Sequence, residues 1–281
     1  MNKPYRHADL LVQIKAMLDE DPENKENYGA SRVYLRLSQT AYNYTGSYST
    51  VYRVMKANNM LHKPKKNPNS LTKEDAEAQK SENLIKQDFS ADIPNTKWLT
   101  DITEVPTADG KLYVSPVLDC FDGQIVGLAV DNSMKKELCI NAFEQACRRH
   151  SAKGMIIHSD RGSQYTSRKF RETLREYGAS QSMSGTGRCY DNARMESFFA
   201  TLKKEKLYKI KTELLPMETV KSIIFRWIFA YYNRKRVYTG NEGGYPPCVK
   251  RQMYYASRQA AKESDAGLSL QGRRHKTVRK S

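Results

Sequence analysis

The N-terminal part of the chain has apolar residues at the spacing of short helices. This spacing occurs in three segments before residue 62, namely 7–20, 28–37 and 50–58. Ser49 fits the N-cap position of the third segment, which carries the basic side chains of Arg53 and Lys56. Three short helices with basic residues on the last one predict a helix-turn-helix-like module over 1–62. A helical hairpin that does not bind DNA is the alternative.

The helical spacing stops after this module. Residues 62–69 are basic and contain two prolines, which is typical of a linker. The acidic, alanine-rich stretch 72–87 predicts a connecting helix, with Thr72 and Asp75 as its N-terminal cap pair. We therefore assign 63–90 to a linker and a connecting helix.

Alternation of apolar and polar residues with a period of two begins after Pro94. It predicts strands over 97–105, 111–118 and 124–130, with Asp-Gly turn signals between them. A helix, a buried strand and a second helix follow, over 135–150, 155–158 and 167–177. An antiparallel meander followed by alternating helices and strands predicts an α/β fold, in which helices cover a mixed sheet.

The C-terminal third has a mainly helical pattern. A stretch rich in Gly and Ser, 182–187, precedes a predicted helix over 191–207, and a core helix follows Pro216. Residues 251–281 are polar and basic, which predicts a C-terminal tail that is partly disordered without a partner.

The net charge of the 281 residues is +16, and its distribution is uneven. Residues 1–70 carry +5 and residues 201–281 carry +13, whereas residues 91–200 have no net charge. Basic flanks around a neutral centre favour a nucleic-acid partner for the flanks. Two solvated charged surfaces are the alternative interpretation.

Two classes of protein are excluded by other features of the composition. No run approaches the roughly 20 apolar residues that a membrane span needs, and the N-terminus has no signal-peptide pattern. We therefore expect no membrane partner and a cytoplasmic location. The five cysteines are odd in number and include no Cys-x-x-Cys pair, which argues against a disulfide framework and a zinc cluster.

Two carboxylates stand in apolar strand contexts. Asp101 lies within the first predicted strand, and Asp160 follows the buried strand at 155–158. Burying an acid is costly unless it is paired, hydrogen-bonded or bound to a metal ion. An exposed edge strand for Asp101 and a turn cap for Asp160 are the alternatives.

A third carboxylate, Glu196, lies on the helix predicted after the Gly and Ser stretch. At about 100° per residue, Asn192 and Lys203 share its helical face. Placement on a strand, a strand end and a helix lets Asp101, Asp160 and Glu196 converge at one end of the sheet. The alternatives are a solvated helical residue for Glu196 and an ordinary surface lysine for Lys203.

The motifs around these carboxylates are long and occur in a set order: WLTDIT at 98–103, HSDRGSQY at 158–165 and DNARMESFF at 191–199. Thirty-five residues separate Asp160 from Glu196. Together the motifs resemble those of bacterial insertion-sequence transposases of the IS-three family, within the retroviral integrase superfamily. The resemblance extends over about residues 5–255. It departs from the family at Asp122-Gly123, where such proteins often have Ser-Arg.

The resemblance implies a ribonuclease H-like catalytic core over 91–250, with a mixed five-stranded sheet flanked by helices. It implies a DDE transposase that cleaves insertion-sequence ends and joins the 3′-hydroxyl to target DNA. Asp101, Asp160 and Glu196 would be the catalytic residues. They would bind two Mg²⁺ ions, with Mn²⁺ as a substitute.

Other residues receive expected roles from the same resemblance and from their charge. Five are expected to contact DNA: Lys203, Asn192, Arg161, Arg53 and Lys56. His158 is interpreted as a structural neighbour of the site, because the metal ions would already supply the nucleophile.

Two rival functions stay open at this point. A catalytically silent or domesticated DNA-binding protein would use the helical module and the basic tail, and a ribonuclease H-type nuclease would share the metal chemistry. For the transposase, we expect insertion-sequence end DNA and target DNA as partners, and a homo-oligomer on paired ends. The product of an upstream reading frame is a further expected partner, and the expected location is the nucleoid in the cytoplasm.

Overall fold

Four helices form the N-terminal module of this computed structural model, which describes residues 7–62, 82–185 and 192–277, with side chains through residue 263. These helices are α1 (Ala8–Asp19), α2 (Pro22–Asn27), α3 (Ala30–Leu37) and α4 (Tyr48–Ala57). The N-cap predicted at Ser49 is wrong, because the Ser47 hydroxyl accepts the Thr50 N–H and α4 starts two residues earlier. Most of the connecting helix predicted over 72–87 lies outside the described residues, and 82–87 is not helical.

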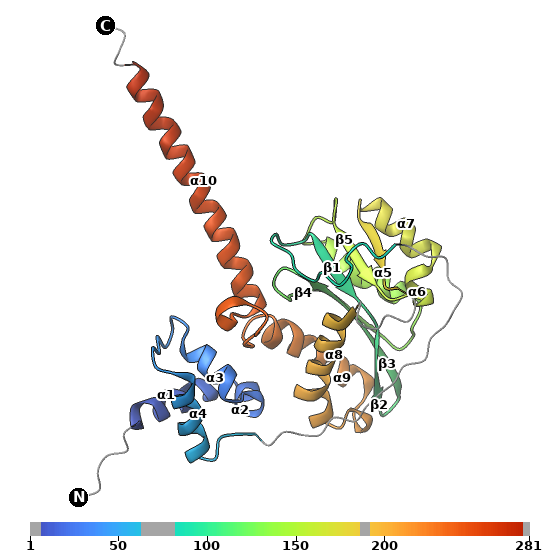
Figure 1. Ribbon diagram of the computed structural model, residues 1–281. Coiled ribbons are helices and arrows are strands. Elements are labelled where there is room, and N and C mark those ends of the chain that lie inside the picture. Colours follow the sequence, from blue (N-terminus) through green and yellow to red (C-terminus); the bar gives the residue numbers. More distant parts are fainter. Residues whose placement is uncertain (1–6, 63–81, 186–191, 278–281) are drawn as a thin grey trace, which may run out of the picture.

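A mixed sheet forms the centre of the remaining chain (Figure 1). Its strands are β1 (Lys97–Thr100), β2 (Thr103–Thr107), β3 (Gly110–Asp119), β4 (Ile125–Asp131), β5 (Ile156–Ser159) and β6 (Ser180–Met183). β3 pairs antiparallel with β1, β2 and β4, whereas β5 pairs parallel with both β1 and β6. The α/β fold with a mixed sheet is confirmed.

The predicted count of five strands is wrong, since the described residues form a six-stranded sheet. The difference arises because the strand predicted over 97–105 is divided at Asp101. Both halves pair with β3 in one continuous register, Thr100 with Val117 and Thr103 with Val114. This register sets Pro116 opposite Asp101, and proline has no N–H to donate to the ladder.

Two apolar cores lie on opposite faces of the sheet. Trp98 packs in the core with α5 (Lys136–Cys147) and α7 (Arg168–Glu176), which flank the short helix α6 (Ser163–Thr166). Its neighbour Leu99 lies in the other core, with α8 (Ala193–Glu205), α9 (Met217–Arg226) and the N-terminal module. Successive strand residues point to opposite faces, so β1 is buried on both sides.

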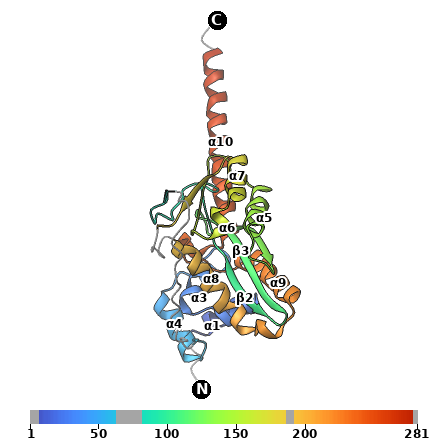
Figure 2. The same cartoon turned by 90° about the vertical axis from the view of Figure 1, so that its right-hand side faces the viewer.

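A long helix, α10 (Pro247–Thr277), projects away from the core (Figures 1 and 2). It follows the shorter elements η2 (Leu207–Lys209), η3 (Thr212–Leu214), the π-helix η4 (Trp227–Tyr232) and η5 (Glu242–Gly244). The tail expected over 251–281 is therefore helical through Thr277, and its last four residues lie outside the described part.

Ion pairs attach the first turns of α10 to the end of the sheet, so this part of the C-terminal segment is not a free tail. The buried Arg251 guanidinium donates to Asp119 Oδ2 at 2.6 Å and to Asp122 Oδ2 at 2.7 Å. Both carboxylates lie at the turn between β3 and β4. Asp122, which departs from the family pattern, thus serves to hold α10.

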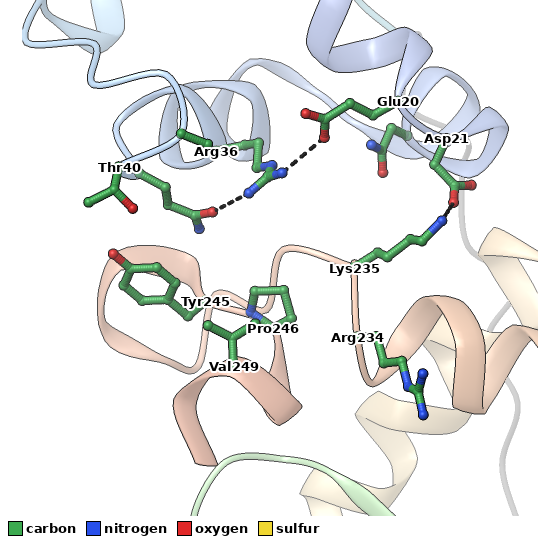
Figure 3. Close-up of a pocket in the computed structure, with 12 residues that line it drawn as sticks. Glu20, Asp21, Arg36, Thr40, Arg234, Lys235, Tyr245, Pro246 and Val249 are labelled. Carbon is green, nitrogen blue, oxygen red and sulfur yellow. Dashed lines mark hydrogen bonds and ion pairs between the residues drawn. The ribbon is translucent and has the colours of Figure 1, made fainter. Parts of the chain in front are cut away.

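The N-terminal module docks against α8 and the loop after η4 through charged contacts. Lys235 pairs with Asp21 at 2.9 Å, beside a pocket between the module and the root of α10 (Figure 3). Glu205 near the end of α8 accepts from Arg236 at 2.8 Å and from Arg32 of α3 at 2.8 Å. The module and the core therefore share a charged, largely buried interface.

Within the described ranges, none of the helices combines the length and the apolar character required to cross a membrane.

Candidate active site

Asp101 lies at the interruption between β1 and β2. The interruption removes it from the sheet ladder, and its own Oδ1 accepts the N–H of Ile102 at 2.7 Å. The residue is half-buried at the end of a strand that is covered on both faces. Its carboxyl group is therefore held at the edge of the core and not in bulk water.

Asp160 follows β5, the parallel neighbour of β1. The register pairs Leu99 with His158, so two residues later Asp101 and Asp160 occupy equivalent positions beyond the two strands. Because parallel strands end at the same edge, their carboxyl groups lie together, as the sequence predicts. Oδ1 of Asp160 accepts the N–H of Gly162 at 3.0 Å, which orients the carboxylate.

The two aspartates perturb each other's ionisation. The pKa of Asp101 is raised to about 7, first by burial and then by the negative charges of Asp160 and Glu196, while the Ile102 N–H and the Lys203 ammonium oppose the shift. Burial also raises the pKa of Asp160, opposed by the hydrogen bond from Gly162. At neutral pH the pair therefore shares a proton or needs a cation.

Glu196 is exposed in the first turn of α8, and its charge reaches Asp101. The structure thus brings the three predicted carboxylates into one electrostatic neighbourhood. It does not place them in a closed ligand cage: across the described residues, no three His, Cys, Asp or Glu side chains form a group that could hold one metal ion.

The donor chemistry nevertheless fits a hard divalent cation. Carboxylate oxygens are the ligands that Mg²⁺ prefers, and Mg²⁺ commonly takes only one or two protein carboxylates and leaves its other positions to water or phosphate. Burial and the neighbouring carboxylates raise the pKa of Asp101, and a divalent cation would stabilise its ionised form. An open cluster of this kind suits ions that bind together with a phosphate substrate.

Lys203 lies two turns beyond Glu196 on α8 and is half-buried. Burial lowers the pKa of its ammonium group, and the carboxylates of Asp101 and Glu104 oppose that shift. Lys203 therefore contributes positive charge to the carboxylate cluster. Asn192, the N-cap of α8, is 5% exposed, and among the described residues neither its amide nitrogen nor its amide oxygen has a hydrogen-bond partner.

His158 is fully buried directly before the site. Its Nδ1 contacts the Ser182 hydroxyl at 2.8 Å and its Nε2 contacts the Ser184 hydroxyl at 3.2 Å. Both ring nitrogens are thus engaged by β6 and the residues after it, which agrees with the structural role expected for His158. The two serines are missed in the sequence because β6 is too polar to resemble a strand.

The remaining expected DNA contacts lie in two separate places. Arg161 follows Asp160, and its Nε donates to the Ser184 carbonyl at 2.6 Å. Arg53 and Lys56 are exposed on α4 of the N-terminal module. The structure therefore groups Arg161 with the carboxylates and leaves the α4 cations on a different surface.

A stability measurement tests the charge repulsion at the site. Folding raises the pKa of Asp101 from 3.8 to about 7, so the stability from its protonated form is fully present below about pH 4 and is lost as pH rises through 7. Asp101→Asn cannot ionise. In EDTA at pH 8, we expect it to raise the free energy of unfolding by roughly 1–3 kcal/mol. Urea denaturation at pH 8 and pH 5 measures this, and a gain of equal size at both values would contradict it.

Comparison with known proteins adds independent information. The family model described as "Integrase core domain" matches residues 91–189. The transposase for insertion sequence element IS904 of Lactococcus lactis is 45% identical over 159 residues, which span 56% of this chain and 62% of that protein. The putative transposase InsK for IS150 of Escherichia coli is 32% identical over 256 residues, which span 90% of this chain and 87% of that protein.

The chain is also similar to a second transposase of Escherichia coli and to a solved integrase core. The transposase InsF for IS3A of Escherichia coli is 33% identical over 232 residues, spanning 82% of this chain and 77% of that protein. Among solved structures, the HTLV-2 integrase catalytic core domain in complex with magnesium, in its trimeric form, aligns with a TM-score of 0.42 at 21% identity. That alignment covers 56% of this chain and 96% of that chain.

The similarity to InsK and InsF extends across most of both partners, and the integrase core match coincides with the part of the chain that carries Asp101 and Asp160. This chain belongs to the family of bacterial insertion-sequence transposases with an integrase core, which are polynucleotidyl transferases.

Proposed function

We propose that this protein cleaves the ends of an insertion sequence and joins the liberated 3′-hydroxyl to target DNA. The observation that carries the proposal is the cluster of Asp101 and Asp160 with Glu196 in electrostatic reach, beside the half-buried Lys203. Residues 91–250 would form the catalytic core and residues 1–62 a DNA-binding module.

Two divalent cations, Mg²⁺ or Mn²⁺ as its substitute, fit this cluster. Asp101, Asp160 and Glu196 would hold these ions. When bound, such ions lower the pKa of an attacking hydroxyl or water and stabilise the leaving oxygen during in-line displacement at phosphorus. The two strand ends hold the aspartates at one edge of the sheet, and Glu196 in the first turn of α8 would supply the third carboxylate.

Residues around the carboxylates would position DNA. The Lys203 ammonium interacts electrostatically with Asp101 and would hold a phosphate at the reacting centre. Arg161 is oriented by the Ser184 carbonyl, and the amide of Asn192, which has no hydrogen-bond partner among the described residues, would offer a donor and an acceptor at the start of α8. Arg53 and Lys56 would bind the DNA backbone at a distance from the reaction.

The proposed partners follow from the reaction. End DNA and target DNA are the substrates, and joining both ends requires a homo-oligomer that holds them as a pair. The product of an upstream reading frame is proposed as a further partner in end recognition. The proposed location is the nucleoid in the cytoplasm.

The test is a strand-transfer assay with labelled duplexes that carry the inverted repeats flanking the coding sequence. We expect joined products with Mg²⁺ and none with EDTA. An RNA-DNA hybrid offered under the same conditions distinguishes a ribonuclease H-type nuclease, which would hydrolyse it. Binding of end DNA without any cleavage in Mg²⁺ or Mn²⁺ would instead support the catalytically silent DNA-binding protein.

A further inference from the structure

A cavity of about 300 Å³ lies beside the carboxylate cluster, between β2 and the segments that follow α8. Residues of four elements or their connections line it: Glu104, Val105, Pro106, Lys203, Leu207, Tyr208, Lys211, Thr212 and Glu213. β2 begins two residues after Asp101, so one wall of the cavity continues directly from the site.

Lys203 connects the cavity to the carboxylates. It lines the cavity, and its ammonium interacts electrostatically both with Asp101 in the site and with Glu104 in the opposite wall. An occupant of the cavity would therefore contact the same lysine as a phosphate at the reacting centre. The cavity is an extension of the site and not a separate pocket.

The walls of the cavity are mainly apolar, and one aromatic ring is strongly exposed. Val105 and Leu207 are buried behind the surface, whereas Tyr208 is 71% exposed. A ring so exposed contributes little to burial of apolar surface in the folded chain. It does present a flat face on which a nucleobase can stack, and stacking on aromatic side chains tolerates any base.

The charged side chains that line the cavity are balanced, with Lys203 and Lys211 against Glu104 and Glu213. Glu104 also pairs at 3.0 Å with Lys111, which lies outside the lining. Lys211 has a left-handed backbone with φ 47° and ψ 63°, and the described residues give its ammonium no ion pair. The turn between η2 and η3 thus holds an available cation beside Tyr208.

The volume restricts what can enter. A cavity of about 300 Å³ is at the small end of ligand sites. It is far too small for a DNA duplex, whose major groove alone is about 12 Å wide, and it suits a single nucleotide with one flat apolar face and a phosphate.

We propose that this cavity binds one unpaired nucleotide of the DNA end, with Tyr208 stacked on the base and Lys203 and Lys211 near its phosphates. Unpairing the end would free the strand that must reach the carboxylates. The inference rests on the proposed function, because it requires a DNA end at Asp101. Tyr208 is a positioning residue here and takes no part in bond making.

A coupling experiment tests the stack. Abasic nucleotides replace, one at a time, the last three nucleotides of each strand of the end duplex, and strand-transfer rates are measured at subsaturating DNA. We expect Tyr208→Ala to reduce the strand-transfer rate on intact ends about tenfold. One abasic position should reduce the rate of the wild-type chain by a similar factor. If Tyr208 stacks on that base, the two losses together equal either one alone.

Matched variants exclude indirect effects. Tyr208→Phe keeps the ring and should keep both the rate and the coupling. Leu214 of the adjacent η3 is 68% exposed and does not line the cavity. The Leu214→Ala variant should therefore behave as wild type. Lys211→Gln removes one cation and should reduce the slope of log affinity against log salt by about one.

The outcomes separate this inference from the proposed function. A wild-type chain that joins no ends contradicts the proposed function itself. In a second outcome, the chain is active and the rate losses from Tyr208→Ala and from the abasic nucleotide multiply at every position. That outcome contradicts only the proposed stacking of Tyr208 on a base. Equal loss in Tyr208→Phe and Tyr208→Ala contradicts it as well, because the aromatic ring would then be irrelevant.

Discussion

Asp101→Asn is expected to reduce strand transfer by about 10³-fold or more, and Glu196→Gln to do the same. Both changes keep the shape of the side chain and remove one negative charge from the proposed metal site. Ligands of catalytic metal ions supply several kcal/mol of transition-state stabilisation, and each 1.4 kcal/mol corresponds to about tenfold in rate. The measurement is single-turnover joining of labelled end DNA in Mg²⁺.

The loss should be confined to chemistry. Gel-shift affinity for end DNA should change by less than about threefold, because removing negative charge does not weaken phosphate contacts. Glu176→Gln removes the same charge from the exposed end of α7 and serves as the matched control. Full joining by either site variant would refute the assignment of that carboxylate.

Arg251→Ala is expected to lower the free energy of unfolding by about 3–5 kcal/mol. The change leaves Asp119 and Asp122, both fully buried, without their shared cation. Burial raises the pKa of Asp122 even with Arg251 present, and the guanidinium opposes that shift. Without the guanidinium, two buried carboxylates would repel each other. Urea denaturation followed by circular dichroism measures the loss.

The pH dependence of this deficit identifies its cause. Burial raises the pKa of Asp122, and its protonation relieves the repulsion, so the deficit should be largest near pH 8 and should shrink as pH falls towards 4.5. Arg258→Ala, on the exposed part of the same helix, is the control and should cost about 0.5 kcal/mol or less. A deficit that is independent of pH would mean that lost packing of the Arg251 stem is responsible.

The positions of the aspartates could be predicted because local patterns carry the information. The apolar residues at 155–157 identify a buried strand, and Asp160, which follows the strand, must lie at the edge of the sheet. Parallel pairing of β1 with β5 then brings Asp101 and Asp160 together. Periodicity places Glu196 on one helical face with Asn192 and Lys203, and the resemblance of the motifs implies its catalytic role.

Features that depend on distant partners could not be predicted in this way. β6 reads SQSM, and its Ser182 is stable in the core because it contacts His158 from another strand. The interruption at Asp101 depends on Pro116, which reaches that position only when β3 pairs with β1. Both are tertiary effects that override local propensity.

The C-terminal segment shows the same limit. Its polar composition indicates a tail, because isolated basic stretches cannot bury enough apolar surface to fold. The ion pair of Arg251 with Asp119 and Asp122 anchors the first turns of α10, and a helix with a fixed start propagates more easily than one that must nucleate alone.

The charged interface between the module and α8 fixes the distance between the module and the carboxylate cluster. Glu205 is held by Arg32 of the module, and Glu196 lies nine residues earlier on the same helix, about 13 Å along its axis. The surface of α4 that carries Arg53 therefore lies at a fixed distance from the carboxylates. A DNA sequence read by α4 would specify the cleaved phosphodiester by its distance along the duplex and not by contacts to the bases beside the cut.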